Sequence, residues 1–156
     1  MRVGLISAAV PLVADAGRLR AAGLAAALRE AGHRAEVCLL PFSLDPLEQL
    51  PQRVAFRQME FAAHYDLVVA FRSPAEVVRH PRKVVWLSGE DRPEAKGLLW
   101  AAVALDCDSA TMTGLGEARR ILAPPLEAAR LAGLGLPAAE WPAEGDWDAA
   151  VRAVLA

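Results

Sequence analysis

Short apolar runs rich in Val, Ile and Leu recur along the chain, and longer stretches with helical patterns separate them. The runs lie at residues 2–8, 34–42, 66–72 and 83–87. Continuous apolar runs of this length are typical of strands that are buried on both faces of a parallel sheet. Their alternation with helices predicts a single Rossmann-like α/β domain with a doubly wound, mainly parallel sheet flanked by helices.

The clearest helix is predicted at residues 16–31, where small and apolar side chains share one stripe. Asp15 is a candidate N-cap, and Gly32 supplies a residue that can end the helix. Further helices are expected at residues 52–64, 93–105, 115–122 and 147–155, with a short helical turn at 73–78 and a weaker strand at 109–113. Residues 41–51 indicate a proline-rich loop or a broken helix, and residues 124–145 have no clear assignment.

A chain of 156 residues can bury one sizeable core but not two. We expect one domain over residues 1–156, with a C-terminal helix at about residues 146–156 that packs back onto it. The 17 basic and 19 acidic side chains nearly cancel, which gives no attraction to nucleic acid. No apolar run approaches the roughly 20 residues that cross a bilayer, and the N-terminus lacks a signal-peptide pattern. We therefore expect a cytoplasmic protein without a membrane span or a nucleic-acid partner.

The cysteines and histidines give no sign of a metal site. Cys38 and Cys107 stand alone in apolar surroundings, so both are expected to be reduced core residues. His33, His64 and His80 lack the spacing of metal ligands, which favours surface or capping roles. We expect neither a metal nor a cofactor.

A ligand of an open parallel sheet lies beyond the carboxyl ends of the strands, where the strand order reverses. The candidate ligand-binding residues in these loops are Ser7, Ala9, Phe71, Ser73, Ser88 and Gly89. The loop after the first run lacks the G-x-G-x-x-G pattern, so a standard dinucleotide enzyme is not expected. A partial match at residues 114–119 has Arg119 in place of the third glycine, which favours an ordinary turn and helix start.

The candidates for catalysis are Glu90, Asp91 and Arg92, in the most polar of these loops. Two adjacent carboxylates beside an arginine can bind a sugar hydroxyl or work as acid and base. The alternative is a solvated, charge-balanced loop. Residues 79–83 form a basic cluster without interleaved aromatic side chains, which indicates a solvated turn.

The segment DLVVAFRSPA at residues 66–75, followed by VRHPRKVVWL at residues 78–87, resembles the bacterial retaining glycosyltransferases of family four. Residues 32–33 and 39–42 are similar to that family as well, and the resemblance extends from the start of the chain to about residue 92. It implies the N-terminal half of a two-domain GT-B enzyme.

The chain departs from this family in three ways. Residues 8–11 replace its glycine-rich loop near the donor phosphates. Gly89 stands where the family has a histidine near the transferred sugar, whereas the family's arginine is retained as Arg92. The C-terminal domain that holds the nucleotide sugar, with two glutamates eight positions apart, has no counterpart. The resemblance therefore implies a domain that does not transfer sugar from a nucleotide on its own.

The function implied by this resemblance is an acceptor-side binding or interaction module. It would bind a carbohydrate acceptor and act as a homodimer or with a separate catalytic subunit. One alternative is an active glycosyltransferase or another sugar-related enzyme that uses the loop after the fourth strand. A further alternative is a Rossmann-type sensor of a small molecule.

Overall fold

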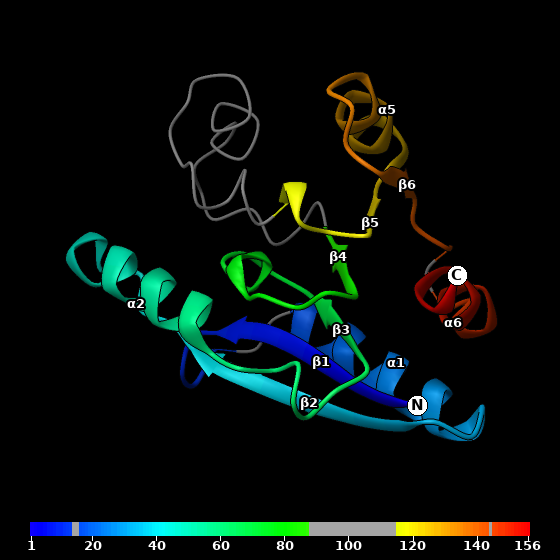
Figure 1. Ribbon diagram of the computed structural model, residues 1–156, viewed down its shortest axis with the longest axis horizontal. Coiled ribbons are helices and arrows are strands. Elements are labelled where there is room, and N and C mark those ends of the chain that lie inside the picture. The colour runs from blue at the N-terminus through cyan, green and yellow to red at the C-terminus, as the bar shows by residue number, and fades with distance from the viewer. Residues whose placement is uncertain (14–15, 88–114, 144) are drawn as a thin grey trace.

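A computed structural model describes residues 1–13, 16–87, 115–143 and 145–156 (Figure 1). The strands are β1 (Arg2–Ala9), β2 (Arg34–Pro41), β3 (Leu67–Ala70), β4 (Lys83–Trp86), β5 (Arg120–Ala123) and β6 (Ala138–Glu140). The helices are α1 (Ala16–Glu30), α2 (Pro46–Gln58), α5 (Pro125–Gly133) and α6 (Trp147–Leu155), and η1 (Ala75–Val77) is a short 3-10 helix.

The six strands form one sheet in the order β2-β1-β3-β4-β5-β6, and every neighbouring pair is parallel. This confirms the predicted α/β class with a parallel sheet flanked by helices. The order reverses at β1, which has β2 on one side and β3 on the other. This is one of the two common doubly wound orders, and it places a topological switch point between β1 and β3.

Helices cover both faces of the sheet. Successive side chains of a strand point to opposite faces, so each strand can pack against both layers of helices. Val3 and Leu5 of β1 pack in the cluster that also contains the buried residues of α1 and α6. Ile6 and Ala8 of β1 pack in the other cluster, together with residues of α2, η1 and α5. The result is a three-layer domain with a fully buried sheet centre.

Helix α6 packs against α1, and the two helices approach closely at Gly23. A Cβ atom at this position would lie 2.3 Å from Cζ2 of Trp147, closer than carbon atoms can approach. The missing side chain of Gly23 therefore lets the Trp147 ring lie directly against α1. Ala150 and Val154 of α6 are buried in the same cluster as the core of α1.

The helix predicted at residues 52–64 is wrong at both ends, because α2 spans Pro46–Gln58. Asp45 caps it by accepting a hydrogen bond from the Leu47 amide at 2.9 Å. Pro46 fits the first turn, where its missing amide proton leaves no helical bond unmade. Pro51 lies inside the helix. Of the two alternatives predicted for residues 41–51, a loop and a broken helix, the structure has a helix from Pro46 onward that contains Pro51.

The helix predicted at residues 115–122 is also wrong. Only its start is helical, and its second half is strand β5, which pairs with β4. A short buried run such as Arg120–Ala123 cannot be distinguished from helix by periodicity alone. The unassigned residues 124–145 contain α5 and β6. The helix expected at 93–105, the strand expected at 109–113 and Cys107 lie outside the described residues.

Candidate functional site

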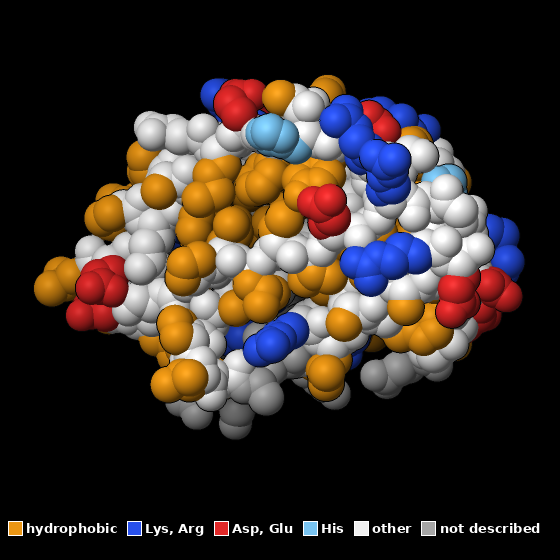
Figure 2. Space-filling model, turned by 90° about the horizontal axis from the view of Figure 1, so that it is seen from below, with side chains coloured by type: hydrophobic (Ala, Val, Ile, Leu, Met, Phe, Trp, Pro, Cys, Tyr) orange, Lys and Arg blue, Asp and Glu red, His pale blue; other side chains and the backbone are white. Residues whose placement is uncertain are grey.

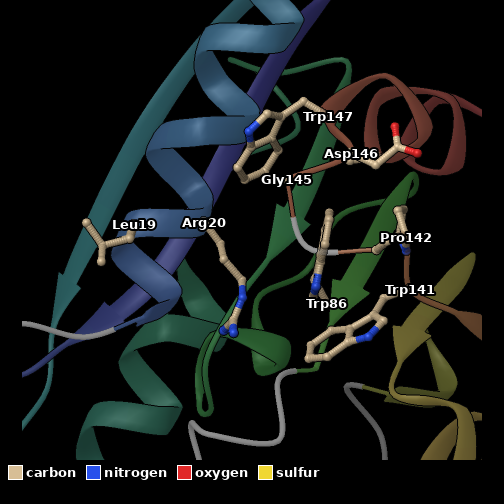
Figure 3. Close-up of a pocket in the computed structure, with 10 residues that line it drawn as sticks. Leu19, Arg20, Trp86, Trp141, Pro142, Gly145, Asp146 and Trp147 are labelled. Carbon is tan, nitrogen blue, oxygen red and sulfur yellow. The ribbon is translucent and has the colours of Figure 1, made fainter.

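Three of the four tryptophans of the chain line one pocket at the carboxyl edge of the sheet (Figure 3). Trp86 is the last residue of β4, Trp141 follows the end of β6, and Trp147 begins α6. Leu19 and Arg20 come from the start of α1, the helix that follows β1. The pocket therefore lies at the edge where a parallel sheet binds ligands, but beside β4 and β6 rather than at the switch point.

The volume of this pocket is about 170 Å³. A cavity of roughly 150 Å³ accepts one benzene molecule, whereas drug-sized ligands occupy about 300–1,000 Å³. One six-membered ring fits, and a dinucleotide or a nucleotide sugar is too large. The remainder of the wall is formed by Pro142, Ala143, Gly145, Asp146 and Ala150.

The aromatic walls are held by packing on neighbouring elements. Trp86 is 5% exposed, and its ring stacks on Phe71 with a centroid distance of 5.7 Å. The guanidinium carbon of Arg20 lies 5.4 Å from the ring centroid of Trp141, which is cation–π distance. Trp147 is fixed against Gly23, as described above. The pocket thus combines flat apolar surfaces with one cation.

The polar groups of the pocket are unevenly satisfied. The side chain of Asp146 accepts a hydrogen bond from the Ala149 amide at 2.9 Å and caps α6. Figure 3 shows this carboxylate pointing away from the tryptophan rings. Nε1 of Trp86, by contrast, is buried and has no hydrogen-bond partner among the described residues. The pocket wall therefore holds one buried indole N–H that has no acceptor among the described residues.

No family model, no curated protein and no solved structure matches this chain. The fold is accordingly assigned from the strand order and the packing of the helices. The resemblance to glycosyltransferases of family four stays a prediction.

Neither a metal site nor a membrane-spanning helix is found among the described residues. These residues contain no group of three or more His, Cys, Asp or Glu side chains that could hold a metal ion. None of the described helices is both long enough and apolar enough to cross a membrane.

The four predicted ligand-binding residues that the structure describes do not line the tryptophan pocket. Ser7 is fully buried within β1, and Ala9 ends that strand. Phe71 follows β3, and its ring stacks on the ring of Trp86, which lines the pocket. The hydroxyl of Ser73 donates to Oε1 of Glu76 at 2.9 Å. Among these four, Phe71 contacts a residue of the pocket wall through its stack on Trp86.

The remaining predicted site residues lie outside the described residues. They are Ser88 and Gly89 of the ligand-binding set and the catalytic candidates Glu90, Asp91 and Arg92. They come directly after Leu87, which follows the pocket residue Trp86 in the chain.

The loops after β1 and β2 meet at a second hollow of about 350 Å³. It is lined by Val10, Pro11, Pro41, Phe42, Ser43, Leu44 and Gln52. Two of the loops expected to surround a ligand are therefore side by side. None of the lining residues carries a charge, and the Ser43 backbone amide donates a hydrogen bond to Oε1 of Gln52 at 2.9 Å.

The solvated turn predicted at residues 79–83 is wrong for two of its members. Lys83 is fully buried in β4, and Nζ donates to the carbonyl oxygens of Glu76 and Val78, each at 2.9 Å. Burial lowers the pKa of Lys83 to about 8, and Glu117, 3.9 Å from Nζ, partly opposes this shift. Lysine can enter the core here because these backbone carbonyl oxygens accept hydrogen bonds from its ammonium group.

His80 is likewise buried, so of its two predicted roles, surface or capping, the surface role is wrong. Its Nε2 lies 3.0 Å from the carbonyl oxygen of Tyr65, and its Nδ1 lies 3.0 Å from the Arg82 amide nitrogen. The imidazole ties the turn before β4 to the chain before β3. Nothing in the basic character of this segment signals that two of its side chains are internal.

Cys38 is half-buried and belongs to a small polar cluster on β2. Its Sγ lies 3.2 Å from the hydroxyl oxygen of Tyr65, and that hydroxyl donates to Oε2 of Glu36 at 3.0 Å. Desolvation, followed by these two hydrogen bonds, raises the pKa of Tyr65. The tyrosine is therefore a neutral donor at physiological pH.

Sequence reasoning missed the pocket because its parts lie far apart in the chain. Trp147 lies in the C-terminal helix that was expected to pack back onto the domain, and Arg20 lies in the helix predicted at residues 16–31. The available signal was the concentration of tryptophan near the end of the chain, with Trp141 and Trp147 six residues apart in a segment rich in Pro and Gly. Tryptophan outside a strand or helix core is a common element of binding sites.

Proposed function

We propose that this protein is a carbohydrate-binding module, similar in role to the acceptor-side half of a family-four glycosyltransferase. The observation that carries the proposal is the pocket of three tryptophans at the carboxyl edge of the sheet. The C–H face of a pyranose ring is apolar and slightly positive, and it stacks on the electron-rich face of an indole. Few residues other than tryptophan offer such a surface.

The size of the pocket supports an acceptor rather than a donor. A volume of about 170 Å³ matches one sugar ring. A sugar nucleotide adds a base, a ribose and two phosphates, for which the pocket has no room. Sugar-nucleotide transfer by this chain alone is therefore not part of the proposed function.

Intrinsic fluorescence provides the test, because three of the four tryptophans line the pocket. Methyl glycosides of common hexoses and hexuronic acids should change the emission with millimolar affinity, which is typical of a single bound ring with few contacts. Trp141→Ala should weaken binding about tenfold, because it removes one stacking surface.

The matched control is Leu134→Ala, which truncates an apolar side chain that is 56% exposed at the end of α5 and outside the pocket. It should leave the affinity unchanged. The proposal is contradicted if no glycoside binds at concentrations up to about 100 mM, while circular dichroism shows a folded protein. Tighter binding of a sugar nucleotide than of any simple glycoside would contradict the acceptor-side assignment.

A second function, self-association as an interaction module, is supported by the exposed face of α2. Leu47, Leu50 and Val54 follow helical spacing, and each is at least half exposed. With Leu44 they form an apolar surface, which we name the α2 surface. Figure 2 shows apolar side chains over the left and middle of the face that it presents, with Lys and Arg mainly toward the right. Contiguous apolar surface of this kind is typical of interfaces.

The occupant we propose for the α2 surface is a second copy of the chain, because two apolar helix faces are complementary to each other around a two-fold axis. Sedimentation velocity should show a dimer at micromolar concentration, and Leu47→Glu should return it to the monomer. A wild-type protein that stays monomeric up to about 100 μM would contradict this second proposal without affecting the first.

A further inference from the structure

The turn after β1 carries an exposed leucine in an unusual backbone conformation. Leu12 is fully exposed, and its φ of 64° is left-handed. The Val13 amide donates to the Val10 carbonyl oxygen at 3.2 Å, which closes a tight turn with Pro11 in it. Proline followed by a residue of positive φ is the pattern of a type II turn, where glycine is usual because an L side chain is strained. Since Leu12 packs on nothing in its own chain, its side chain points to a contact with another molecule.

The hollow of about 350 Å³ lies beside this turn. Val10 and Pro11 form part of its wall, and Leu44 of the α2 surface forms another part. The hollow therefore joins the turn and the α2 surface into one apolar area. Because a cavity of roughly 150 Å³ accepts one benzene molecule, the hollow has room for a leucine side chain together with a neighbouring valine.

We propose that two copies of the chain associate with Leu12 of each copy inserted into the hollow of the other. This inference rests on the proposed self-association through the α2 surface and adds a second contact to it. In a two-fold dimer the same patch serves both partners, so a projecting side chain and the hollow that receives it must lie on one surface. Leu12 and the hollow meet this condition, because the neighbouring Pro11 is part of the wall.

The apolar area shows why the α2 surface needs this second contact. A fully exposed leucine carries about 100 Å² of apolar surface, so the four partly exposed side chains of the α2 surface offer about 260 Å² per copy. Specific interfaces bury at least about 600 Å² per partner, of which about 65%, or about 390 Å², is apolar in homodimers. Leu12 and Val13 raise the apolar area to about 400 Å² per copy, which meets this requirement.

Sedimentation velocity of the full chain tests the contact with Leu12→Gly. Glycine suits a left-handed turn, so this variant removes the leucine side chain without adding strain. The dissociation constant of the dimer should rise at least about 100-fold, because each of the two copies loses a buried leucine that contributes about tenfold or more. Leu134→Gly, a matched control at the end of α5 and outside the hollow, should leave the dissociation constant unchanged.

A pair of charged variants tests whether the hollow receives Leu12. Gln52→Glu keeps the oxygen that accepts from the Ser43 amide and places a carboxylate in the wall of the hollow. Leu12→Lys places an ammonium group in the turn. Each variant alone should form a dimer about tenfold or more weaker than that of the wild type, because an unpaired charge would be buried.

Mixing the two charged variants gives the decisive measurement. In the mixed dimer the Lys that replaces Leu12 in one copy enters the hollow with the Glu that replaces Gln52 in the other, and the second contact is that of the wild type. The mixed dimer should therefore be at least about tenfold tighter than either variant with itself. Pairing of charges within one copy cannot produce this result, because each copy carries one of the two substitutions.

The outcomes separate this inference from the proposed self-association. Dissociation by Leu47→Glu but not by Leu12→Gly overturns the inference and leaves the α2 surface as the interface. A mixed dimer no tighter than those of the separate variants overturns the hollow as the place that receives Leu12. A wild-type chain that stays monomeric up to about 100 μM overturns both the inference and the self-association.

Discussion

Lys83 and Trp86 stand at the two ends of the four-residue strand β4 and lie on opposite faces of the sheet. Both side chains are buried, and both carry a polar group into the core. Nζ of Lys83 donates to two backbone carbonyl oxygens, whereas Nε1 of Trp86 has no acceptor among the described residues. The same strand thus holds one donor that the fold satisfies and one that has no acceptor among the described residues.

The difference indicates two roles for buried polar groups. The bonds of Lys83 close the turn between η1 and β4, so this charge holds the loop after β3 against the sheet. Its surroundings include the bidentate pair of Arg57 and Glu117, whose closest contact is 2.7 Å. Trp86 makes no hydrogen bond through Nε1 to the described residues and lines a pocket. The satisfied group stabilises the fold, whereas Trp86 contributes to the wall of the proposed binding pocket.

The largest loss of stability is expected from Lys83→Met. Methionine has a similar volume to lysine but no hydrogen-bond donor. The carbonyl groups of Glu76 and Val78 would then be buried without a hydrogen bond, and the free energy of unfolding should fall by about 3 kcal/mol. Urea denaturation at pH 7 measures this change. Arg79→Met is the matched control, since it removes an exposed charge from the same segment and should change stability by less than about 0.5 kcal/mol. A loss below about 1 kcal/mol for Lys83→Met would contradict a structural role.

A change in pH is expected to have a smaller effect on the free energy of unfolding. Burial lowers the pKa of Lys83 to about 8 in the folded protein, from 10.5 in the unfolded chain. Between these values the unfolded chain binds more protons than the folded protein, so stability rises with pH. From pH 7 to pH 9.5 the gain from this group should be about 2 kcal/mol. The raised pKa of Tyr65 does not change the free energy of unfolding with pH below pH 10. The stability that this group contributes is lost only as the pH rises above that value.

Urea denaturation at several pH values, with wild type and Lys83→Met in parallel, isolates this contribution. The difference between the two proteins should widen with rising pH, because only the wild type carries the titrating amine. A constant difference across this range would mean that Lys83 titrates near its ordinary pKa and that its burial is incomplete.

The same contrast explains how far sequence patterns could predict this molecule. The parallel sheet was predictable because runs such as residues 2–8 and 83–87 are continuously apolar, and that pattern has few alternatives. The basic composition of residues 79–83 gave the wrong environment for Lys83, because burial depends on carbonyl groups that only the folded loop brings into reach. Strand β5 and helix α2 were misassigned where short runs and prolines allow two structures.

The tryptophan pocket was not predictable for a related reason. Arg20, Trp86 and Trp141 are separated by long stretches of chain and meet only through the strand order. Local patterns identified the carboxyl edge of the sheet as the place for a ligand, and this rule does include the pocket. They could not identify which loops meet there, because that depends on the twist of the sheet and on the seat of α6 at Gly23.

The smallest effect, and the sharpest comparison with Lys83, is expected from Trp86→Phe in the absence of ligand. The lost N–H has no acceptor among the described residues, so its removal breaks no described hydrogen bond. The phenyl ring can keep the stack on Phe71, and the loss of volume should cost about 1 kcal/mol. Trp147→Phe makes the same chemical change at a half-buried position and should cost a similar amount. Urea denaturation of both variants gives the comparison. A loss of about 3 kcal/mol in Trp86→Phe alone would mean that Nε1 has a partner in the folded protein, and the contrast between the two ends of β4 would disappear.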